Sequence, residues 1–324
     1  MYKSTLVALA AAACATGAAA QDTKVAIGIS GWTGFAPLTL AKEAGLFKKY
    51  GLDVDIKKIP QKDRHLAIAS GDVQCAATTV ETWVVWNANG VATTQIFQLD
   101  KSYGADGMAV KPTIAKVTDL KGKTVGVTRF GSSSDFAMRY VLQKYGLRPE
   151  KDVTLIQLGG MIELATALSK KLIAAATLSS PADLRARKSG ALQLVDMAKV
   201  GVSFPQSAIV TTRSYVNAHS GHVLDFLRGY SEGIQSMALD QNFAKKVIEK
   251  YTRETDPEII DATYQYGLDY IAPIPYPTRD GIAEVLKQSI HPKAKTANPD
   301  DFIDMSLVKK LDDGGFFRSV RQKQ

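Results

Sequence analysis

Cysteine is nearly absent from this sequence of 324 residues, which contains two, and only Cys75 lies beyond the hydrophobic N-terminus. A single cysteine cannot form an internal disulfide, so the hydrophobic core must stabilise the fold without covalent crosslinks. Cys75 lies in the stretch VQCAAT, which is typical of a buried strand. We therefore expect it to be a small core side chain rather than a nucleophile.

Long hydrophobic runs are also missing, and none is long enough to span a bilayer. The run from Thr5 to Ala15 follows Lys3 and precedes the small residues Ala18 to Ala20. This is the pattern of an export signal that is cleaved before Gln21. Lipid anchoring at Cys14 is the less favoured alternative, because lipoprotein signals usually carry a leucine three residues before the cysteine.

The sequence lacks the motifs of several common enzyme classes. It contains no G-x-S-x-G, H-E-x-x-H or G-x-x-x-x-G-K-[ST] pattern. Among its four histidines, His219 and His222 have a helical spacing, but no third metal ligand accompanies them locally. We therefore expect no catalytic residue, no metal and no cofactor, and we expect that the chain is not an enzyme.

Basic residues are not concentrated in any one segment, although the net charge is +8. No basic run is interleaved with aromatic residues, so we expect no nucleic-acid partner. The composition, 45% hydrophobic and 22% charged, is typical of a globular protein, and the length favours about two domains.

The chain contains an internal repeat of about fifty residues. Residues 24–79 and residues 124–178 both predict the order strand, turn, helix, strand, helix, strand, and KYGL occurs at 49–52 and again at 144–147. Short apolar strands that alternate with amphipathic helices are typical of parallel sheets. The sequence therefore predicts an α/β fold with two lobes, each a mostly parallel sheet flanked by helices.

The segments outside the repeats suggest how the two lobes are joined. Further strands are expected at 192–197 and 201–212, and the remaining C-terminal part is mostly helical, which would complete the first lobe. The chain would then cross between lobes twice, near 106–111 and 203–208, and form a hinge beside a cleft. We predict the division 1–20 signal peptide, 21–107 plus 207–324 lobe 1, and 108–206 lobe 2.

The turns that follow the predicted strands form the candidate ligand site. Ligands of open parallel sheets bind outside the carboxyl ends of the strands, where helix N-termini favour an oxyanion or a carbonyl group. Four such turns are rich in Gly, Ser or Thr and carry nearby aromatic residues. We predict a ligand-binding site that consists of Trp32, Thr33, Phe35, Thr78, Thr79, Glu81, Trp83, Arg129, Ser132, Ser133, Ser134 and Ser180.

Several of these residues have an expected role in binding and a simpler structural alternative. Arg129 and the serine turn, Ser132 to Ser134, would hold an oxyanion or carbonyl end, or a serine would only cap the following helix. Trp32 would contact an apolar part of the ligand, or pack onto the core of its lobe. Glu81 would bind an amino group if it faces the cleft, and is otherwise an acid in the first turn of a helix.

The stretches GISGWTGFAPLTLAKEAGLFKKYGLDVDI, LAIASGDVQCAATT and VTDLKGKTVGV, with the serine turn before DFAMRYVLQKYGL, resemble a known family. They are similar to substrate-binding proteins of ABC importers in the nitrate, sulfonate and taurine group, within the thiamine-pyrimidine-synthase-like superfamily. The resemblance covers about residues 24–290. It implies a periplasmic binding protein of type II fold that closes about its hinge on one small ligand. It also implies a permease partner in the inner membrane, and we expect a monomer.

The resemblance leaves the ligand open. Sulfonate binders of this group often have Trp-Ala-Pro where this chain has Ser179-Ser180-Pro181. A nitrate-, sulfonate- or taurine-like anion is the favoured class, and a small amine, amide or pyrimidine, bound for uptake or for sensing, is the alternative. A thiamine-pyrimidine-synthase-like enzyme is less favoured, because that group uses a cysteine-rich motif which this chain lacks.

Overall fold

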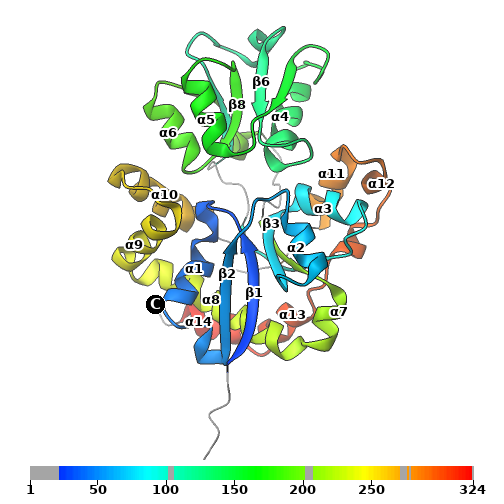
Figure 1. Cartoon of the computed structure of the whole chain (residues 1–324), viewed down its shortest axis with the longest axis vertical. Helices are drawn as coiled ribbons and strands as arrows, with labels where there is room; N and C mark the ends of the chain where they lie inside the picture. Colours follow the sequence, from blue (N-terminus) through cyan, green and yellow to red (C-terminus); the bar gives the residue numbers. More distant parts are fainter. Residues whose placement is uncertain (1–21, 101–105, 201–206, 271–275, 277–278, 323–324) are drawn as a thin grey trace, which may run out of the picture.

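The computed structural model describes residues 22–100, 106–200, 207–270, 276 and 279–322, and the predicted signal lies outside them. Two lobes each contain one five-stranded sheet (Figure 1). The sheet of lobe 1 has the order β2-β1-β3-β10-β4, with β1 Thr23–Ile29, β2 Leu52–Lys58, β3 Cys75–Thr79, β4 Thr94–Gln98 and β10 Ser207–Thr211. The sheet of lobe 2 has the order β7-β6-β8-β5-β9, with β5 Asp106–Val110, β6 Thr124–Val127, β7 Thr154–Gln157, β8 Ala175–Ser179 and β9 Leu192–Asp196.

The two sheets have the same topology, as the internal repeat predicts. In lobe 1, β1 pairs in parallel with β2 and β3, and β10 runs antiparallel between β3 and β4. In lobe 2, β6 pairs in parallel with β7 and β8, and β5 runs antiparallel between β8 and β9. The expectation of an α/β fold with two mostly parallel sheets is therefore confirmed.

The first crossing between the lobes lies earlier than the sequence suggested. Asp106 and Gly107 already pair with β8 as part of β5, so the crossing expected near 106–111 is wrong, and the chain leaves lobe 1 after β4. Ser207 begins β10 in the sheet of lobe 1, and the residues 203–206 of the second expected crossing lie outside the described residues. The rest of the proposed domain division stays a prediction.

Helices cover the sheets in the order that the apolar periodicity predicts. Those within the two repeats are α1 Ala36–Glu43, α2 Arg64–Ser70, α3 Val80–Ala88, α4 Ser133–Lys144, α5 Met161–Ser169 and α6 Ala182–Lys188. The C-terminal part adds α7 Arg213–Ala218, α8 Ser220–Leu239, α9 Gln241–Thr252, α10 Pro257–Tyr270, α11 Arg279–Gln288, α12 Pro292–Lys295, α13 Ser306–Asp313 and α14 Phe316–Arg321. These C-terminal helices lie around the sheet of lobe 1, where α8 and α9 pack on α1 (Figure 1).

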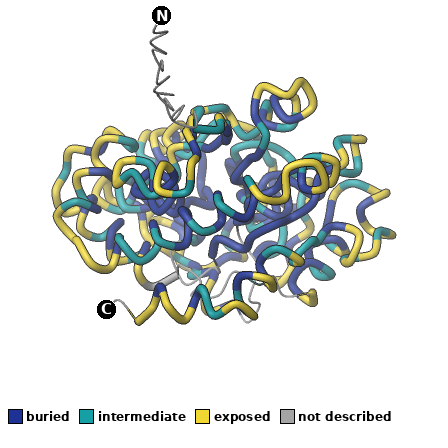
Figure 2. Tube along the Cα trace, turned by 90° about the horizontal axis from the view of Figure 1, so that it is seen from below, coloured by how far each residue is buried: buried dark blue, intermediate teal, exposed yellow. Residues whose placement is uncertain are grey.

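The central strands β3, β8 and β10 are buried, whereas the helices expose their outer faces (Figure 2). Cys75 on β3 is 2% exposed, and burial raises the pKa of its thiol to about 12. A thiol with so high a pKa carries almost no thiolate at neutral pH. The expectation that Cys75 is a small core side chain is confirmed.

The two lobes contact each other on both sides of the cleft. On one side, α6 of lobe 2 meets the segment 254–266 of lobe 1 through ion pairs and hydrogen bonds. Arg185 Nε lies 2.7 Å from Glu254 Oε2, and Lys188 Nζ lies 2.8 Å from Glu258 Oε2. On the other side, Gly131 lies against Val85 and Ile290. The contacts of α6 are mainly ionic, whereas those of Gly131 are apolar.

We expect Arg185→Gln to weaken the contact between the lobes. The side chain of Glu254 is 6% exposed, so removal of Arg185 leaves a buried carboxylate without its ion-pair partner, at a cost of about 1–3 kcal/mol. The melting temperature should fall by several degrees, and the radius of gyration from small-angle X-ray scattering should not decrease. Arg228→Gln is the matched control, because Arg228 has similar exposure and pairs with Asp225 inside α8. Equal melting temperatures of the two variants would contradict this expectation.

Candidate functional site

A cavity of about 580 Å³ lies between the two lobes, at the carboxyl ends of the parallel strands. Lobe 1 lines it with the turns after β1, β2 and β3, and lobe 2 with the turns after β6, β7 and β8. The lining from lobe 1 is Ser30, Trp32, Phe35, Pro60, Gln61, Lys62, Arg64, Thr78, Thr79, Thr82, Val85 and Ser207. The lining from lobe 2 is Asp106, Thr128, Arg129, Gly131, Ser132, Ser133, Gln157, Gly159, Gly160, Met161 and Ser179.

The structure brings seven of the twelve predicted site residues to this cavity, which we call the central cavity. They are Trp32, Phe35, Thr78, Thr79, Arg129, Ser132 and Ser133. The other five, Thr33, Glu81, Trp83, Ser134 and Ser180, do not line it. That any of the twelve binds a ligand stays a prediction.

The surroundings of three of these five residues show why they do not line the central cavity. Trp83 is fully buried, and its ring centroid lies 5.5 Å from that of Phe302, so the core alternative holds for this aromatic. The Ser180 hydroxyl lies 3.1 Å from the Thr263 hydroxyl of α10 and joins the lobes beside the cavity, where Ser179 takes the lining position. Thr33 is buried in the first turn after β1.

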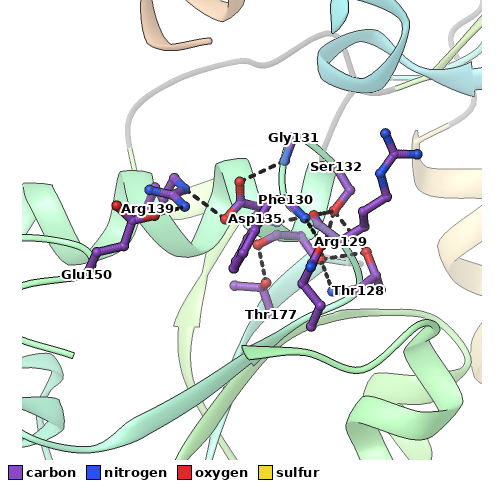
Figure 3. Close-up of polar contacts among 11 residues, drawn as sticks. Thr128, Arg129, Phe130, Gly131, Ser132, Asp135, Arg139, Glu150 and Thr177 are labelled. Atoms are coloured by element: carbon purple, nitrogen blue, oxygen red, sulfur yellow. Dashed lines mark hydrogen bonds and ion pairs between the residues drawn. The ribbon is translucent and has the colours of Figure 1, made fainter. Parts of the chain in front are cut away.

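Ser134 and Ser132 belong to a hydrogen-bonded network inside the serine turn (Figure 3). The Thr128 hydroxyl lies 2.8 Å from each of the two serine hydroxyls. Ser132 Oγ also donates to the Arg129 carbonyl at 2.6 Å and caps α4 by accepting from the Asp135 amide. These hydroxyls therefore bond mainly to their own turn, and the capping alternative describes Ser132.

Ser133 and Arg129 are the members of this turn that remain directed to the cavity. Ser133 is the first residue of α4, and the structure shows no hydrogen bond from its hydroxyl to another described residue. The amides at the start of a helix have no partner within the helix and favour an oxygen anion or a carbonyl. The guanidinium of Arg129 extends away from the network (Figure 3). Gly131 lies in the same turn and has a φ of 81°, a left-handed backbone conformation that glycine adopts without strain.

Glu81 is buried between the lobes and does not line the central cavity. It is 5% exposed, and it lines a second cavity of about 420 Å³ between α4 and the helices α11 and α12. Burial raises the pKa of its carboxyl to about 8, so it is mostly protonated at neutral pH. Glu81 also lines a small pocket beside Ser133 and Met161 of the central cavity, and its expected contact with an amino group stays a prediction.

The sequence analysis missed the turns after β2 and β7. Residues 60–64 and 157–161 contribute to the central cavity from opposite lobes. Both turns lie between a strand and a helix of the repeat, so the rule that selected the other turns also applied to them. The turn after β2 has no Gly, Ser or Thr in residues 60–64, whereas Gly159 and Gly160 in the turn after β7 were a signal that could have identified it.

Arg64, the first residue of α2, is the most deeply buried charged side chain of the central cavity, at 1% exposure. Its Nε donates to the Ile59 carbonyl at 2.9 Å, and its Nη1 donates to the Ala77 carbonyl at 2.5 Å. These bonds attach the turn after β2 to the end of β3. Among the described residues, none accepts a hydrogen bond from its Nη2, and no carboxylate forms an ion pair with it.

The charged lining of the central cavity is predominantly positive. Lys62 and Arg64 come from lobe 1 and Arg129 from lobe 2, whereas Asp106 is the acidic residue of the described lining. A low-dielectric cavity strengthens the attraction of such groups for an anion. The electrostatics of the cavity thus favour a negatively charged or strongly polar ligand.

Two further structural tests concern membranes and metals. Within the described ranges, no helix has both the length and the apolar character that a membrane span needs. In the same part of the chain, no group of three or more His, Cys, Asp or Glu side chains could hold a metal ion. The rings of His219 and His222 stack on each other with centroids 5.6 Å apart.

The hydrogen bonds of the serine turn predict how substitutions of Ser132 and Ser133 affect stability. Ser132→Ala removes a helix cap and the bond to the Arg129 carbonyl, so it should lower the free energy of unfolding by about 1 kcal/mol. This corresponds to a fall in melting temperature of roughly 2–4 °C. Ser133→Ala is the matched control and should leave the melting temperature of the unliganded protein unchanged. If both variants melt like the wild type, the network does not stabilise the turn.

Glu81 generates a prediction for pH dependence. Its pKa is raised from 4.5 to about 8 by burial, so the folded state holds a proton that the unfolded state releases between these values. The contribution of Glu81 to the free energy of unfolding is therefore present at low pH. It is lost as the pH rises through this window, at up to roughly 1.4 kcal/mol per unit.

The isosteric variant Glu81→Gln tests this linkage by urea unfolding between pH 4.5 and pH 8. It should have a stability close to the wild type at the acidic end and exceed the wild type at the alkaline end. Asp53→Asn, whose side chain is exposed on β2, serves as the control and should follow the wild type throughout. A constant difference between Glu81→Gln and the wild type across the window would rule out the linkage.

Comparisons with known proteins agree with this geometry. The NMT1/THI5-like family matches residues 32–244. The nitrate/nitrite binding protein NrtA of Synechocystis sp. (strain ATCC 27184 / PCC 6803 / Kazusa) is 30% identical over 168 residues, which cover 43% of this chain and 36% of that protein. The chain thus spans about a third of the length of that relative.

Solved structures show a similar fold over nearly the whole chain. The alkanesulfonate-binding protein SsuA from Xanthomonas axonopodis pv. citri bound to MOPS has a TM-score of 0.76 at 17% identity, covering 89% of this chain and 100% of that chain. The periplasmic nitrate-binding protein NrtA from Synechocystis PCC 6803 has a TM-score of 0.72 at 18% identity, covering 93% and 89%. The two-lobed architecture is thus that of these binding proteins, and the chain belongs to the NMT1/THI5-like family.

Proposed function

We propose that this chain is the periplasmic solute-binding component of an ABC importer and captures a small polar or anionic organic compound between its lobes. The observation that carries this proposal is the central cavity, which is lined by the strand-end turns of both sheets. A solute in this position contacts both lobes at once. Because a ligand favours the state in which it makes more contacts, such a solute would stabilise the closed arrangement.

The size and the walls of the central cavity narrow the class of solute. Its volume of about 580 Å³ lies in the range of sites that hold organic ligands and greatly exceeds the volume of a four-atom anion such as nitrate. Trp32, Phe35 and Met161 supply apolar wall, while Thr78 and Ser133 supply hydroxyls. These walls suit a compound that has a polar end and an apolar body.

The names of similar proteins support the same class of solute. The names of NrtA and SsuA state that these proteins bind nitrate or nitrite and alkanesulfonates, all of which are oxyanions. The positive lining of the central cavity is consistent with an oxyanion. The alternative of an amine loses the residue that suggested it, because Glu81 lies outside this cavity.

A binding role is favoured over an enzymatic one. The thiol of Cys75 is buried in the lobe 1 sheet, and its raised pKa makes it a poor nucleophile. The similar proteins NrtA and SsuA are named as binding proteins. We propose further that the protein acts as a monomer and delivers its solute to a permease in the inner membrane.

The test is a thermal-shift screen of mature residues 21–324 after removal of any bound solute by partial unfolding and dialysis. The panel contains nitrate, sulfonates, carboxylates, amines, amides and pyrimidines. A ligand at about a hundred times its dissociation constant adds roughly 2.7 kcal/mol, which raises the melting temperature by several degrees. A hit identifies the solute class. A protein that responds to none of these classes, in dye-based and calorimetric melting alike, would contradict the proposed solute-binding function.

A further inference from the structure

Arg64 is a buried cation for which the described protein provides no counterion. Its side chain is 1% exposed, and its aliphatic part lies beside Gly28 of β1. Burial lowers the pKa of the guanidinium to about 9, a value at which the group remains charged at neutral pH. Transfer of an unpaired charge out of water is unfavourable unless another group compensates it. The structure thus contains a positive charge that lacks its partner.

The unused hydrogen-bonding capacity of Arg64 lies on one nitrogen. Carbonyl oxygens of Ile59 and Ala77 accept from Nε and Nη1, so these atoms hold the guanidinium in a fixed orientation. Nη2 is buried without an acceptor among the described residues, and Arg64 lines the central cavity. The Thr78 hydroxyl, which is also buried, lines the same cavity and likewise lacks a partner. Two buried donors without acceptors therefore border one cavity.

We propose that Arg64 binds the anionic end of the solute through Nη2, and that the solute is an organic anion with an apolar body. This inference rests on the proposed solute-binding function and assigns the recognition of charge to lobe 1. Carboxylates and sulfonates present oxygens that accept charge-assisted hydrogen bonds from a guanidinium. The apolar body of such a solute would lie against Trp32, Phe35 and Met161.

The opposite lobe supports an anion in the same place. Arg129 lines the central cavity from lobe 2. Burial lowers the pKa of His65, which follows Arg64 on α2, and the charge of Arg129 lowers it further. The field of one lobe thus reaches the helix of the other. Arg64 and Arg129 line the same cavity from opposite lobes, so an anion between them would be attracted by both charges. The solute would act as the counterion that makes closure favourable.

The structural alternative is that Arg64 serves only to attach the turn after β2 to β3. Its two carbonyl contacts do this in the unliganded protein, whatever the solute. The alternative predicts that loss of the guanidinium lowers stability without changing the preference for a charged solute. The proposal predicts a change in that preference, so the two are separable by measuring affinity and stability on the same variants.

The experiment compares wild type, Arg64→Gln and Arg228→Gln by isothermal titration calorimetry at millimolar probe concentrations. Arg228 is the matched control, because it is an arginine of lobe 1 that pairs with Asp225 on α8 and does not line the central cavity. The probes are butane-1-sulfonate, hexane-1-sulfonate, butanoate and hexanoate, with neutral butane-1-sulfonamide and hexanamide as uncharged counterparts. We expect at least one anion to bind the wild type and to bind Arg64→Gln about 10- to 100-fold more weakly, as loss of a charge-assisted bond implies. Arg228→Gln should bind each anion with an affinity within about threefold of the wild type.

Three results would overturn the proposal. The first is equal affinity of an anion for wild type and Arg64→Gln. The second is that the wild type binds the neutral counterparts more tightly than the anions. That result would leave the proposed solute-binding function intact. The third is binding of none of these probes while the wider thermal-shift panel finds an uncharged solute. If Arg64→Gln does not fold, Arg64→Lys takes its place. This variant retains the charge but not the fixed orientation, so it should weaken the binding of the anion by a smaller factor.

Discussion

The structure depends on an exchange of strands between the two lobes. The chain leaves lobe 1 after β4 and enters lobe 2 as β5, and it leaves lobe 2 after β9 and returns as β10. Each arriving strand lies antiparallel inside the sheet that it joins, between two strands of that lobe. Neither sheet is continuous without its arriving strand. In each sheet the departing and the arriving strand are paired neighbours, because β10 pairs with β4 and β5 pairs with β9.

This constraint also places the chemistry of the molecule. Because the parallel strands of both sheets end at the cleft, the turns after them meet in one cavity, and helix N-termini come with them. The ionic contacts of α6 with the segment 254–266 lie beside this cavity and link the lobes independently of a solute. A bound solute therefore adds to an interlobe contact that already exists.

Burial of polar groups distinguishes the parts of this cavity that stabilise the fold from the parts that remain available to a solute. In the serine turn, the hydroxyls of Thr128, Ser132 and Ser134 bond to one another and are thereby satisfied. At Arg64 and Thr78, buried donors lack acceptors within the described chain. A satisfied polar group contributes to the fold, whereas an unsatisfied one in a cavity wall gains most from a ligand. We therefore expect the turn after β2, rather than the turn after β6, to bind the charged group of the solute.

The sequence by itself determined the secondary structure of the repeats, their duplication and the resulting α/β lobes, because apolar periodicity and turn residues act over a few neighbouring positions. It also identified the turns after β1, β3 and β6 as cavity lining, since strand direction fixes which end of a sheet they occupy. Only the tertiary structure decided the roles of Trp83 and Glu81, which face the core and a second cavity. Only it showed that Arg64 is buried without a counterion among the described residues, because burial and pairing depend on β1, the turn after β2 and β3, which meet only when lobe 1 folds.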